Sequence, residues 1–361
     1  MENTKPLDTD ILFMQRCIQI AQNGLGFVAP NPMVGCVIVH KDVIIGEGYH
    51  KQYGEAHAEV HAINAVSDKS LLSRSTLYVN LEPCAHYGKT PPCTDLIIKH
   101  KLPRVVIANT DSNPLVAGKG IKKLTEAGCK VTTGVLEKEG RFLNRRFFTF
   151  HEQKRPYLIL KWAESADGFI DKLRDKNAEI KPNWITSERT RAIVHKWRTE
   201  EAAIMAGTNA VLNDNPSLTA RDWKGKNPVR VILDRMLLVP ISYHVYSSDA
   251  PTFIFNTIKS GTQDNVKFIR HSFDAGLIDY MLSYLYESGL QSLIIEGGAC
   301  TLNAFINKNL WDEARVFKGQ VYYTKGVAAP ALKETPDLVS NYGGDILFTF
   351  YNKNPMLLPA T

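Results

Sequence analysis

Short apolar segments with strand-like spacing alternate along this chain with segments of helical spacing, and this alternation constrains the fold more than any other feature. In the first half, apolar runs bounded by Gly, Pro and Asn predict strands at 33–40, 43–49, 76–81, 104–109 and 130–135. The segments between them predict helices at 11–21, 56–66, 94–100 and 118–127. Because strands and helices that alternate form a sheet covered by helices, we expect a layered α/β domain.

The second half repeats the alternation after a polar segment at 151–156 that ends in proline. Runs rich in Val and Ile predict strands at 157–162, 202–206, 229–233, 252–256 and 292–295, with helices at 188–198 and 275–288. Continuous apolar strands of this kind are typical of a largely parallel sheet. A chain of 361 residues also exceeds the length at which one core usually splits, so we expect an α/β domain at 1–150 and another at 151–361.

Charge and cysteine content limit the classes of protein. The net charge of +6 comes from scattered Lys and Arg without a long basic run, so it fits a phosphorylated small substrate as well as nucleic acid. Six cysteines are too sparse for a disulfide scaffold. The chain has no apolar run of 18 residues and begins with a polar, acidic segment. We therefore expect a cytoplasmic protein with free or metal-bound thiols.

A group of metal-binding residue types lies at 57–93. His57 and Glu59 open one predicted helix, Cys84 follows a strand, and Cys93 precedes another helix. One imidazole and two thiolates hold zinc tetrahedrally and leave the fourth position to water, which is typical of a catalytic site. The His-x-Glu and Pro-Cys pattern matches zinc deaminases, in which the glutamate is the general acid/base. Here nine positions separate the cysteines, more than in the short form of the motif.

Other interpretations of this group are a structural zinc completed by His61 or His86, a disulfide between the cysteines, or two buried thiols. They leave Glu59 without a role, so we favour the catalytic site. His57 and His61 also have the spacing of a metalloprotease helix, but that motif needs Glu directly after the first histidine, where this chain has Ala58.

Residues 30–37, 54–62 and 81–95 closely resemble the bifunctional deaminase-reductases of riboflavin biosynthesis, and the resemblance extends over nearly the whole chain. The long loop between the cysteines separates that family from cytidine and tRNA-adenosine deaminases. The resemblance implies a cytidine-deaminase-like domain followed by a dihydrofolate-reductase-like domain. It also implies hydrolytic deamination of a diaminopyrimidinone ribosylamine 5′-phosphate with one Zn²⁺ per chain, then reduction of its ribosyl group with NADPH.

By the same resemblance His57, Cys84 and Cys93 are the zinc ligands and Glu59 is the catalytic proton shuttle. The positions that match substrate contacts of the deaminase are His50, His86, Lys89, Asp111 and Asn113. Lys89 suits a phosphate group as a point charge.

The second half has one phosphate-type signal of its own, an apolar strand at 293–295 followed by Glu296 and the Gly297-Gly298 turn. It has no GxGxxG, so an ordinary dinucleotide fold is not expected. Segments 161–168, 184–187, 207–221 and 296–298 resemble the family's reductase. The resemblance implies that NADPH contacts Ala163, Trp184, Ala210, Asp214, Gly297 and Gly298. It implies that the substrate contacts Arg198, Leu218, Arg221 and Glu296. Lys161 joins Glu296 as a candidate for polarising the imine of the opened sugar, and the alternative is that these two residues form a salt-bridged or solvated pair.

One segment departs from the family. Residues 169–183 are longer and more charged than the family's short Ser/Gly-rich segment, and we expect a mobile loop there. Pro182 has no hydroxyl for the substrate contact that the family makes in this segment.

The resemblance therefore implies a bifunctional enzyme that acts on a small phosphorylated pyrimidine and not on nucleic acid or a membrane, and we expect it to form a homo-oligomer. Two alternatives remain open at this stage. One is a polynucleotide deaminase with an accessory RNA-binding domain, and the other is a zinc-stabilised binding protein whose reductase half is inactive.

Overall fold

The computed structural model describes residues 8–87, 91–113, 116–175 and 179–352. The chain divides into two compact units, with Gln153 in the first and Lys154 at the start of the second. The polar residues 151–153 are not a linker, because they belong to helix α6 (Arg145–Gln153). None of the helices in the described residues combines the length and the apolar character of a membrane-spanning segment.

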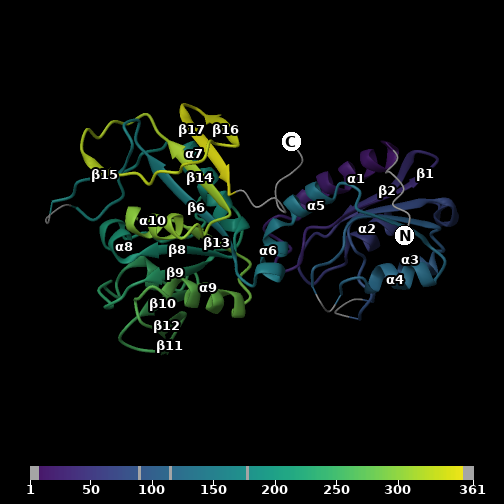
Figure 1. The fold of residues 1–361 in the computed structure, drawn as a ribbon, viewed down its shortest axis with the longest axis horizontal. Coiled ribbons are helices and arrows are strands. Elements are labelled where there is room, and N and C mark those ends of the chain that lie inside the picture. Colours follow the sequence, from purple (N-terminus) through teal and green to yellow (C-terminus); the bar gives the residue numbers. More distant parts are fainter. Residues whose placement is uncertain (1–7, 88–90, 114–115, 176–178, 353–361) are drawn as a thin grey trace. The chain divides into compact units, whose positions relative to one another are not determined.

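The first unit is a five-stranded sheet with helices on both faces (Figure 1). Its spatial order is β2-β1-β3-β4-β5, with β3, β4 and β5 parallel and β1 antiparallel to both of its neighbours. The strands are β1 (Gly35–His40), β2 (Val43–Tyr49), β3 (Thr76–Leu81), β4 (Arg104–Asn109) and β5 (Lys130–Thr133). The helices are α1 (Asp8–Ala21), α2 (Ala58–Ala65), α3 (Cys93–Lys99), α4 (Lys119–Glu126), α5 (Glu137–Leu143) and α6, with short 3-10 turns at Gln22–Gly24 and Lys69–Arg74.

Apolar side chains fill both faces of this sheet. On one face, residues of α1 such as Met14 pack against Val37 and Val106. On the other face, residues of α2 such as Ile63 pack against Ile38 and Val105.

The predicted hairpin between β1 and β2 is confirmed, because Lys41 and Asp42 both have positive φ, as a two-residue turn requires.

The second unit contains a ten-stranded sheet in the order β11-β12-β10-β9-β8-β13-β6-β14-β17-β16. The seven strands from β12 to β14 in this order are parallel, which confirms the predicted parallel sheet, and antiparallel strands complete both ends. The strands are β6 (Tyr157–Glu164), β8 (Ala203–Gly207), β9 (Val229–Leu233), β10 (Thr252–Asn256), β11 (Gly261–Gln263), β12 (Val266–Arg270), β13 (Ser292–Ile295), β14 (Glu313–Lys318), β16 (Leu338–Tyr342) and β17 (Asp345–Tyr351). The helices are α7 (Glu188–Glu200), α8 (Thr208–Asp214), α9 (Leu277–Glu287) and α10 (Ala299–Asn307), with a 3-10 turn at His244–Tyr246.

The main core of the second unit joins the central strands to α9 and α10, where Met281 and Phe305 are buried among Leu160 and Ile295. A smaller cluster places Val194 of α7 against Phe317. Both α7 and α9 were predicted, and the Ser187 side chain caps the first of them by accepting a hydrogen bond from the Thr190 N–H.

The expectation of a mobile loop over 169–183 is wrong at its beginning. Residues Phe169–Lys172 form strand β7, which pairs with β15 (Gly326–Ala328) in a separate two-stranded sheet. Arg174 then binds Asp171 and Asp214, with its Nη2 2.6 Å from Asp214 Oδ1. A paired strand and partly buried ion pairs hold this part of the segment in place.

Candidate functional site

Three side chains of the first unit converge as zinc ligands must. His57 immediately precedes α2, Cys84 follows β3, and Cys93 is the first residue of α3. The Nδ1 atom of His57 lies 3.6 Å from Cys84 Sγ and 3.4 Å from Cys93 Sγ. All three ligand atoms lie within 4.8 Å of one another. A single zinc ion fits this donor set, with one coordination position left open.

The alternatives to a catalytic zinc fit the structure less well. Both cysteines are free thiols, so the disulfide interpretation is wrong. Among the described residues, neither His61 nor His86 joins the ligand cluster, so the fourth ligand of a closed structural site is missing. The neighbouring side chains also change the acidity of Cys84. Hydrogen bonds from Cys93 and His57 outweigh the effect of burial and lower the pKa of the Cys84 thiol to about 4. A thiol that ionises so readily is a ready metal ligand.

Glu59 lies in the first turn of α2, and its carboxylate is buried. Burial raises the pKa of Glu59, and its Oε2 atom has no hydrogen-bond partner among the residues that the structure describes. An unpartnered buried carboxylate oxygen is costly, and it needs a ligand or water to satisfy it. Glu59, His57 and Cys84 all line one cavity of about 300 Å³, where such a ligand would sit.

The same cavity gathers most of the predicted substrate contacts of the deaminase, namely His50, His86, Asp111 and Asn113. His50 is held by two hydrogen bonds, with its Nδ1 3.1 Å from the Ala56 carbonyl and its Nε2 3.2 Å from Asn31 Nδ2. Burial lowers the pKa of His50, which favours the neutral ring. Burial raises the pKa of Asp111 to about 6. Lys89 lies outside the described residues.

Sequence reasoning missed several residues that line this cavity. Asn31, Tyr53 and Phe147 contribute to the wall. Asn31 stands between two prolines in a segment that the resemblance already singled out, so it could have been found. Phe147 belongs to α6, which the sequence analysis did not predict, and nothing in its local pattern connects it to the zinc ligands.

Glu82 organises the loop that carries Asp111 and Asn113. Its buried carboxylate accepts hydrogen bonds from four backbone N–H groups: Asp111 and Gly118 donate to Oε2, and Gly120 and Ile121 donate to Oε1. The donor–acceptor distances run from 2.8 to 3.2 Å. Glycine is needed at 120, because a Cβ atom there would lie 2.1 Å from the Pro83 carbonyl oxygen. A carboxylate at the start of α4 also complements the helix dipole.

The predicted reductase residues gather at the carboxyl ends of three neighbouring strands. Ala163 lies near the end of β6, the glycine turn follows β13, and α8 with Ala210 and Asp214 follows β8. Because β8, β13 and β6 are adjacent and parallel, these positions share one edge of the sheet. Ligands of open α/β sheets bind at this edge. Trp184 is exposed and lies under the Arg191 guanidinium, 4.3 Å from the ring centroid.

Three charged side chains of the predicted substrate site contact one another beside this edge. Glu296 Oε2 accepts a hydrogen bond of 2.9 Å from Arg198 Nη2, and Lys161 Nζ lies 3.7 Å from Glu296 Oε1. Burial opposes ionisation of Glu296, but Arg198 and Lys161 outweigh it and lower its pKa to about 2. Burial lowers the pKa of Lys161. Within the described part of the chain, Glu296 Oε1 and Arg198 Nε are buried without hydrogen-bond partners, as expected of groups that bind a ligand.

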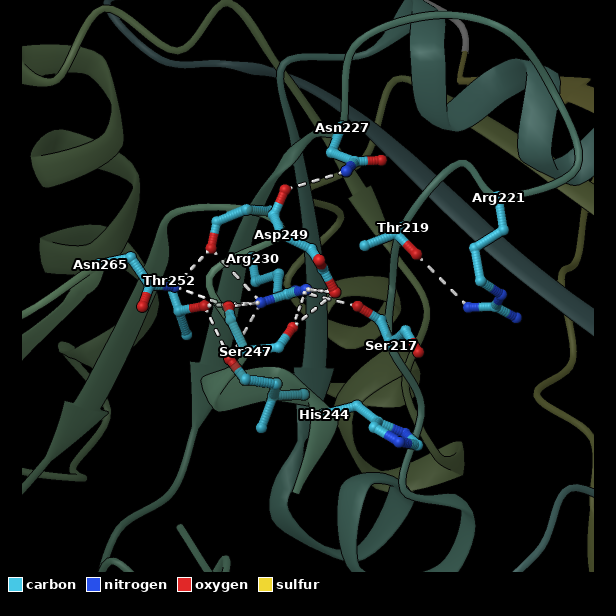
Figure 2. Close-up of polar contacts among 12 residues, drawn as sticks. Ser217, Thr219, Arg221, Asn227, Arg230, His244, Ser247, Asp249, Thr252 and Asn265 are labelled. Carbon is cyan, nitrogen blue, oxygen red and sulfur yellow. Dashed lines mark hydrogen bonds and ion pairs between the residues drawn. The ribbon is translucent and has the colours of Figure 1, made fainter. Parts of the chain in front are cut away.

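The remaining two predicted substrate residues lie in the segment 217–221. Leu218 is buried with φ of 52°, a left-handed conformation that non-glycine residues rarely adopt. Arg221 Nη1 donates to Thr219 Oγ1 at 3.4 Å (Figure 2). The Thr219 carbonyl accepts a hydrogen bond from Arg198 Nη1, so this segment is tied directly to the charged group around Glu296.

Comparison with known proteins identifies the families of the two domains. Residues 7–109 match the cytidine and deoxycytidylate deaminase zinc-binding region, and residues 156–319 match the RibD C-terminal domain. The fold and the ligand set thus define a zinc-binding deaminase joined to a reductase of the dihydrofolate-reductase type.

Full-length relatives show the family. The riboflavin biosynthesis protein RibD of Aquifex aeolicus is 37% identical over 360 residues, covering 95% of this chain and 98% of the relative. The Bacillus amyloliquefaciens protein of that name is 41% identical over 364 residues, covering 95% and 96%. A crystal structure of a diaminohydroxyphosphoribosylaminopyrimidine deaminase/5-amino-6-(5-phosphoribosylamino)uracil reductase from Thermotoga maritima has a TM-score of 0.81 and 36% identity, covering 95% and 98%. The chain belongs to the RibD family of bifunctional deaminase-reductases of riboflavin biosynthesis. The alternative with an RNA-binding second domain is wrong, because that domain is a reductase.

Proposed function

We propose that residues 1–150 deaminate a diaminopyrimidinone ribosylamine 5′-phosphate and that residues 151–361 then reduce its ribosyl group with NADPH. The observation that carries the first half is the convergence of His57, Cys84 and Cys93 beside the buried carboxylate of Glu59, whose Oε2 atom has no hydrogen-bond partner among the described residues. The Thermotoga maritima relative, which acts as both deaminase and reductase on such intermediates, supports the same substrate class.

For deamination, His57, Cys84 and Cys93 would hold the zinc, which supplies Lewis-acid activation of water at the open position. Glu59 accepts a proton from the attacking water and delivers it to the departing amine, so that ammonia leaves as the new C–O bond replaces the C–N bond. Its raised pKa suits this exchange, because a carboxylate that binds its proton more tightly is a better base. His50, His86, Asp111 and Asn113 line the cavity, where they can orient the pyrimidine, and Lys89 is proposed as a phosphate contact.

For reduction, the hydride comes from NADPH, and the protein supplies position and charge. We assign the cofactor to the strand-end positions Ala163, Trp184, Ala210, Asp214, Gly297 and Gly298. We propose that Lys161 and Glu296 polarise the imine of the opened sugar and that Arg198 and Arg221 bind the phosphate. A guanidinium grips phosphate through paired hydrogen bonds, which suits arginine in this role.

A product analysis by mass separates the two activities. Incubation with the ribosylamine phosphate alone should shift its mass by about +1 as water replaces ammonia, and NADPH should add about +2. An Arg221→Ala variant should raise the KM for the deaminated intermediate. If the substrate mass does not change in either condition, the proposed substrate is wrong.

We also propose that the protein forms a homo-oligomer and lies in the cytoplasm. Light scattering would test the first proposal, and cell fractionation would test the second.

A further inference from the structure

The largest fully buried side chain of the described residues is a charged one, Arg230 on the central strand β9. Its guanidinium donates hydrogen bonds to carbonyl and hydroxyl oxygens, and its ion pair with a carboxylate is long (Figure 2). The nearest acidic group is Asp249, whose Oδ2 lies 4.0 Å away and whose side chain is 65% exposed. Arg230 therefore depends mainly on neutral oxygens, with a distant carboxylate, to offset the cost of burying its charge.

Those oxygens come from two segments distant in sequence. In the first segment, Nε donates to the Ser217 carbonyl at 2.9 Å. In the second segment, Nη1 donates to the Ser247 carbonyl at 2.8 Å, and Nη2 donates to Ser247 Oγ at 3.0 Å. Val245, Ala250 and Thr252 accept further bonds from Nη1 at 3.2 to 3.4 Å. Asn265 fixes the second segment independently by donating to the Ser247 and Ala250 carbonyls.

A buried ion held this way is an expensive means of stabilising a core. Apolar side chains of similar volume often do as well as or better than buried charged groups. The distinctive result of these contacts is geometric, because a rigid planar fork connects the firmly held 245–252 segment to the backbone of Ser217. The next residue, Leu218, has the left-handed backbone that such a constraint would maintain.

The Ser217 contact lies at the start of the segment 217–221, which ends at Arg221. Figure 2 shows Arg221 beyond Thr219 from Arg230, so Arg230 does not itself reach the predicted phosphate contact. Arg198 holds the middle of the segment through the Thr219 carbonyl at 3.0 Å. Arg230 and Arg198 thus fix two successive points of the backbone that carries Leu218 and Arg221.

We propose that Arg230 is a positioning residue of the reductase, whose guanidinium holds residues 217–221 in the conformation that presents Leu218 and Arg221 to the substrate. The inference rests on the proposed function of those two residues. If Arg221→Ala leaves the KM for the deaminated intermediate unchanged, that proposed function fails, whatever Arg230 does.

The test is steady-state reductase kinetics on full-length Arg230→Met, with Arg230→Lys as the conservative variant. For Arg230→Met we expect the KM for the deaminated intermediate to rise about tenfold, equivalent to about 1.4 kcal/mol. The KM for NADPH and kcat should stay within about twofold, because uniform substrate binding is what is lost. Arg230→Lys should lie between wild type and Arg230→Met, since an ammonium keeps the charge but not the fork.

Two controls separate positioning from loss of folded protein. All five tryptophans lie between residues 162 and 311, so their fluorescence reports folding of the second unit, and deaminase activity gives the concentration of intact chain. Arg155→Met is the matched variant, because it removes another largely buried guanidinium. Arg155 donates two hydrogen bonds to Asp312, of 2.5 and 2.8 Å, and these contacts lie outside the segment 217–221. It should lower stability and leave both KM values unchanged.

The proposal is overturned if folded Arg230→Met keeps both KM values, if both rise equally, or if only kcat falls. Should Arg230→Met fail to fold, Ser247→Ala decides, because it removes the hydroxyl that accepts from Nη2 and donates to Asp249 Oδ2, and it leaves the Ser247 carbonyl contact in place. A selective rise in the KM for the intermediate in Ser247→Ala supports the proposal, and an unchanged KM overturns it.

Discussion

Replacing Glu82 by glutamine should destabilise the first unit selectively. The carboxylate accepts four backbone N–H groups, two at each oxygen, and it is buried. A glutamine oxygen can keep two of these bonds, but its NH₂ group then faces the other two donors. Each buried donor left unsatisfied costs about 1–3 kcal/mol, so we expect a loss of about 3 kcal/mol in the free energy of unfolding.

The assay must resolve the two units. Tryptophan fluorescence reports only the second unit, so the first is followed by hydrogen exchange of residues 111–121 in increasing urea. The amides of Gly118, Gly120 and Ile121 should lose protection in the variant. Because the same loop carries Asp111 and Asn113, the KM of deamination should also rise.

The matched control is Glu126→Gln. It neutralises an exposed carboxylate on α4, the helix whose first N–H groups bind Glu82, and this carboxylate lies 3.8 Å from Lys122 Nζ. Surface pairs of this kind are worth less than about 1 kcal/mol, so exchange should hardly change. If Glu82→Gln is as stable as Glu126→Gln, Glu82 does not anchor the loop as the contacts indicate.

Three further predictions concern the metal, pH and a buried ion pair. Removing zinc with a chelator should abolish deamination and leave reductase activity unchanged, because the ligand cluster and the strand-end site lie in different units. Burial, with the charges of Arg198 and Arg221, lowers the pKa of His195 from 6.5 to about 4. Between these pH values only the unfolded chain binds the proton, so acidification from pH 6.5 to 4 should lower the free energy of unfolding of the second unit by at most about 3 kcal/mol. Urea unfolding followed by tryptophan fluorescence measures this pH dependence, and His195→Asn should flatten it. Asp10 is buried and binds Arg104 through two hydrogen bonds, so Asp10→Ala should leave a cation unpaired and lower the melting temperature of the first unit in calorimetry; an unchanged transition would contradict this.

The sequence predicted the elements whose apolar pattern is strong. Buried strands such as β4 and β13 read as continuous Val, Ile and Leu runs, and the structure contains both. Strand β16 was missed because it is exposed on both faces and carries no alternation. Helices α5 and α6 were missed because most of their residues are polar, and the burial of Phe147 and Phe148 is a tertiary effect.

The candidate site divides in the same way. The zinc ligands were predicted because Cys84 and Cys93, each directly after a proline, form with the His-x-Glu pattern a motif that is typical of zinc deaminases. The roles of Glu82 and Arg230 were not, since they depend on backbone groups, which have no signature in the sequence. Asp214 was assigned to the cofactor, but its contact with Arg174 emerges only from the structure.

Ammonia release by Glu59→Gln, measured together with zinc content, tests most directly that the metal cluster is a catalytic centre. Glutamine keeps the size of the side chain but cannot exchange protons, and Glu59 is not a member of the ligand cluster. We predict one zinc per chain as in the wild type and a loss of deamination of at least about a hundredfold, the scale of general acid–base catalysis. A variant that holds its zinc and still releases ammonia at the wild-type rate would contradict the account.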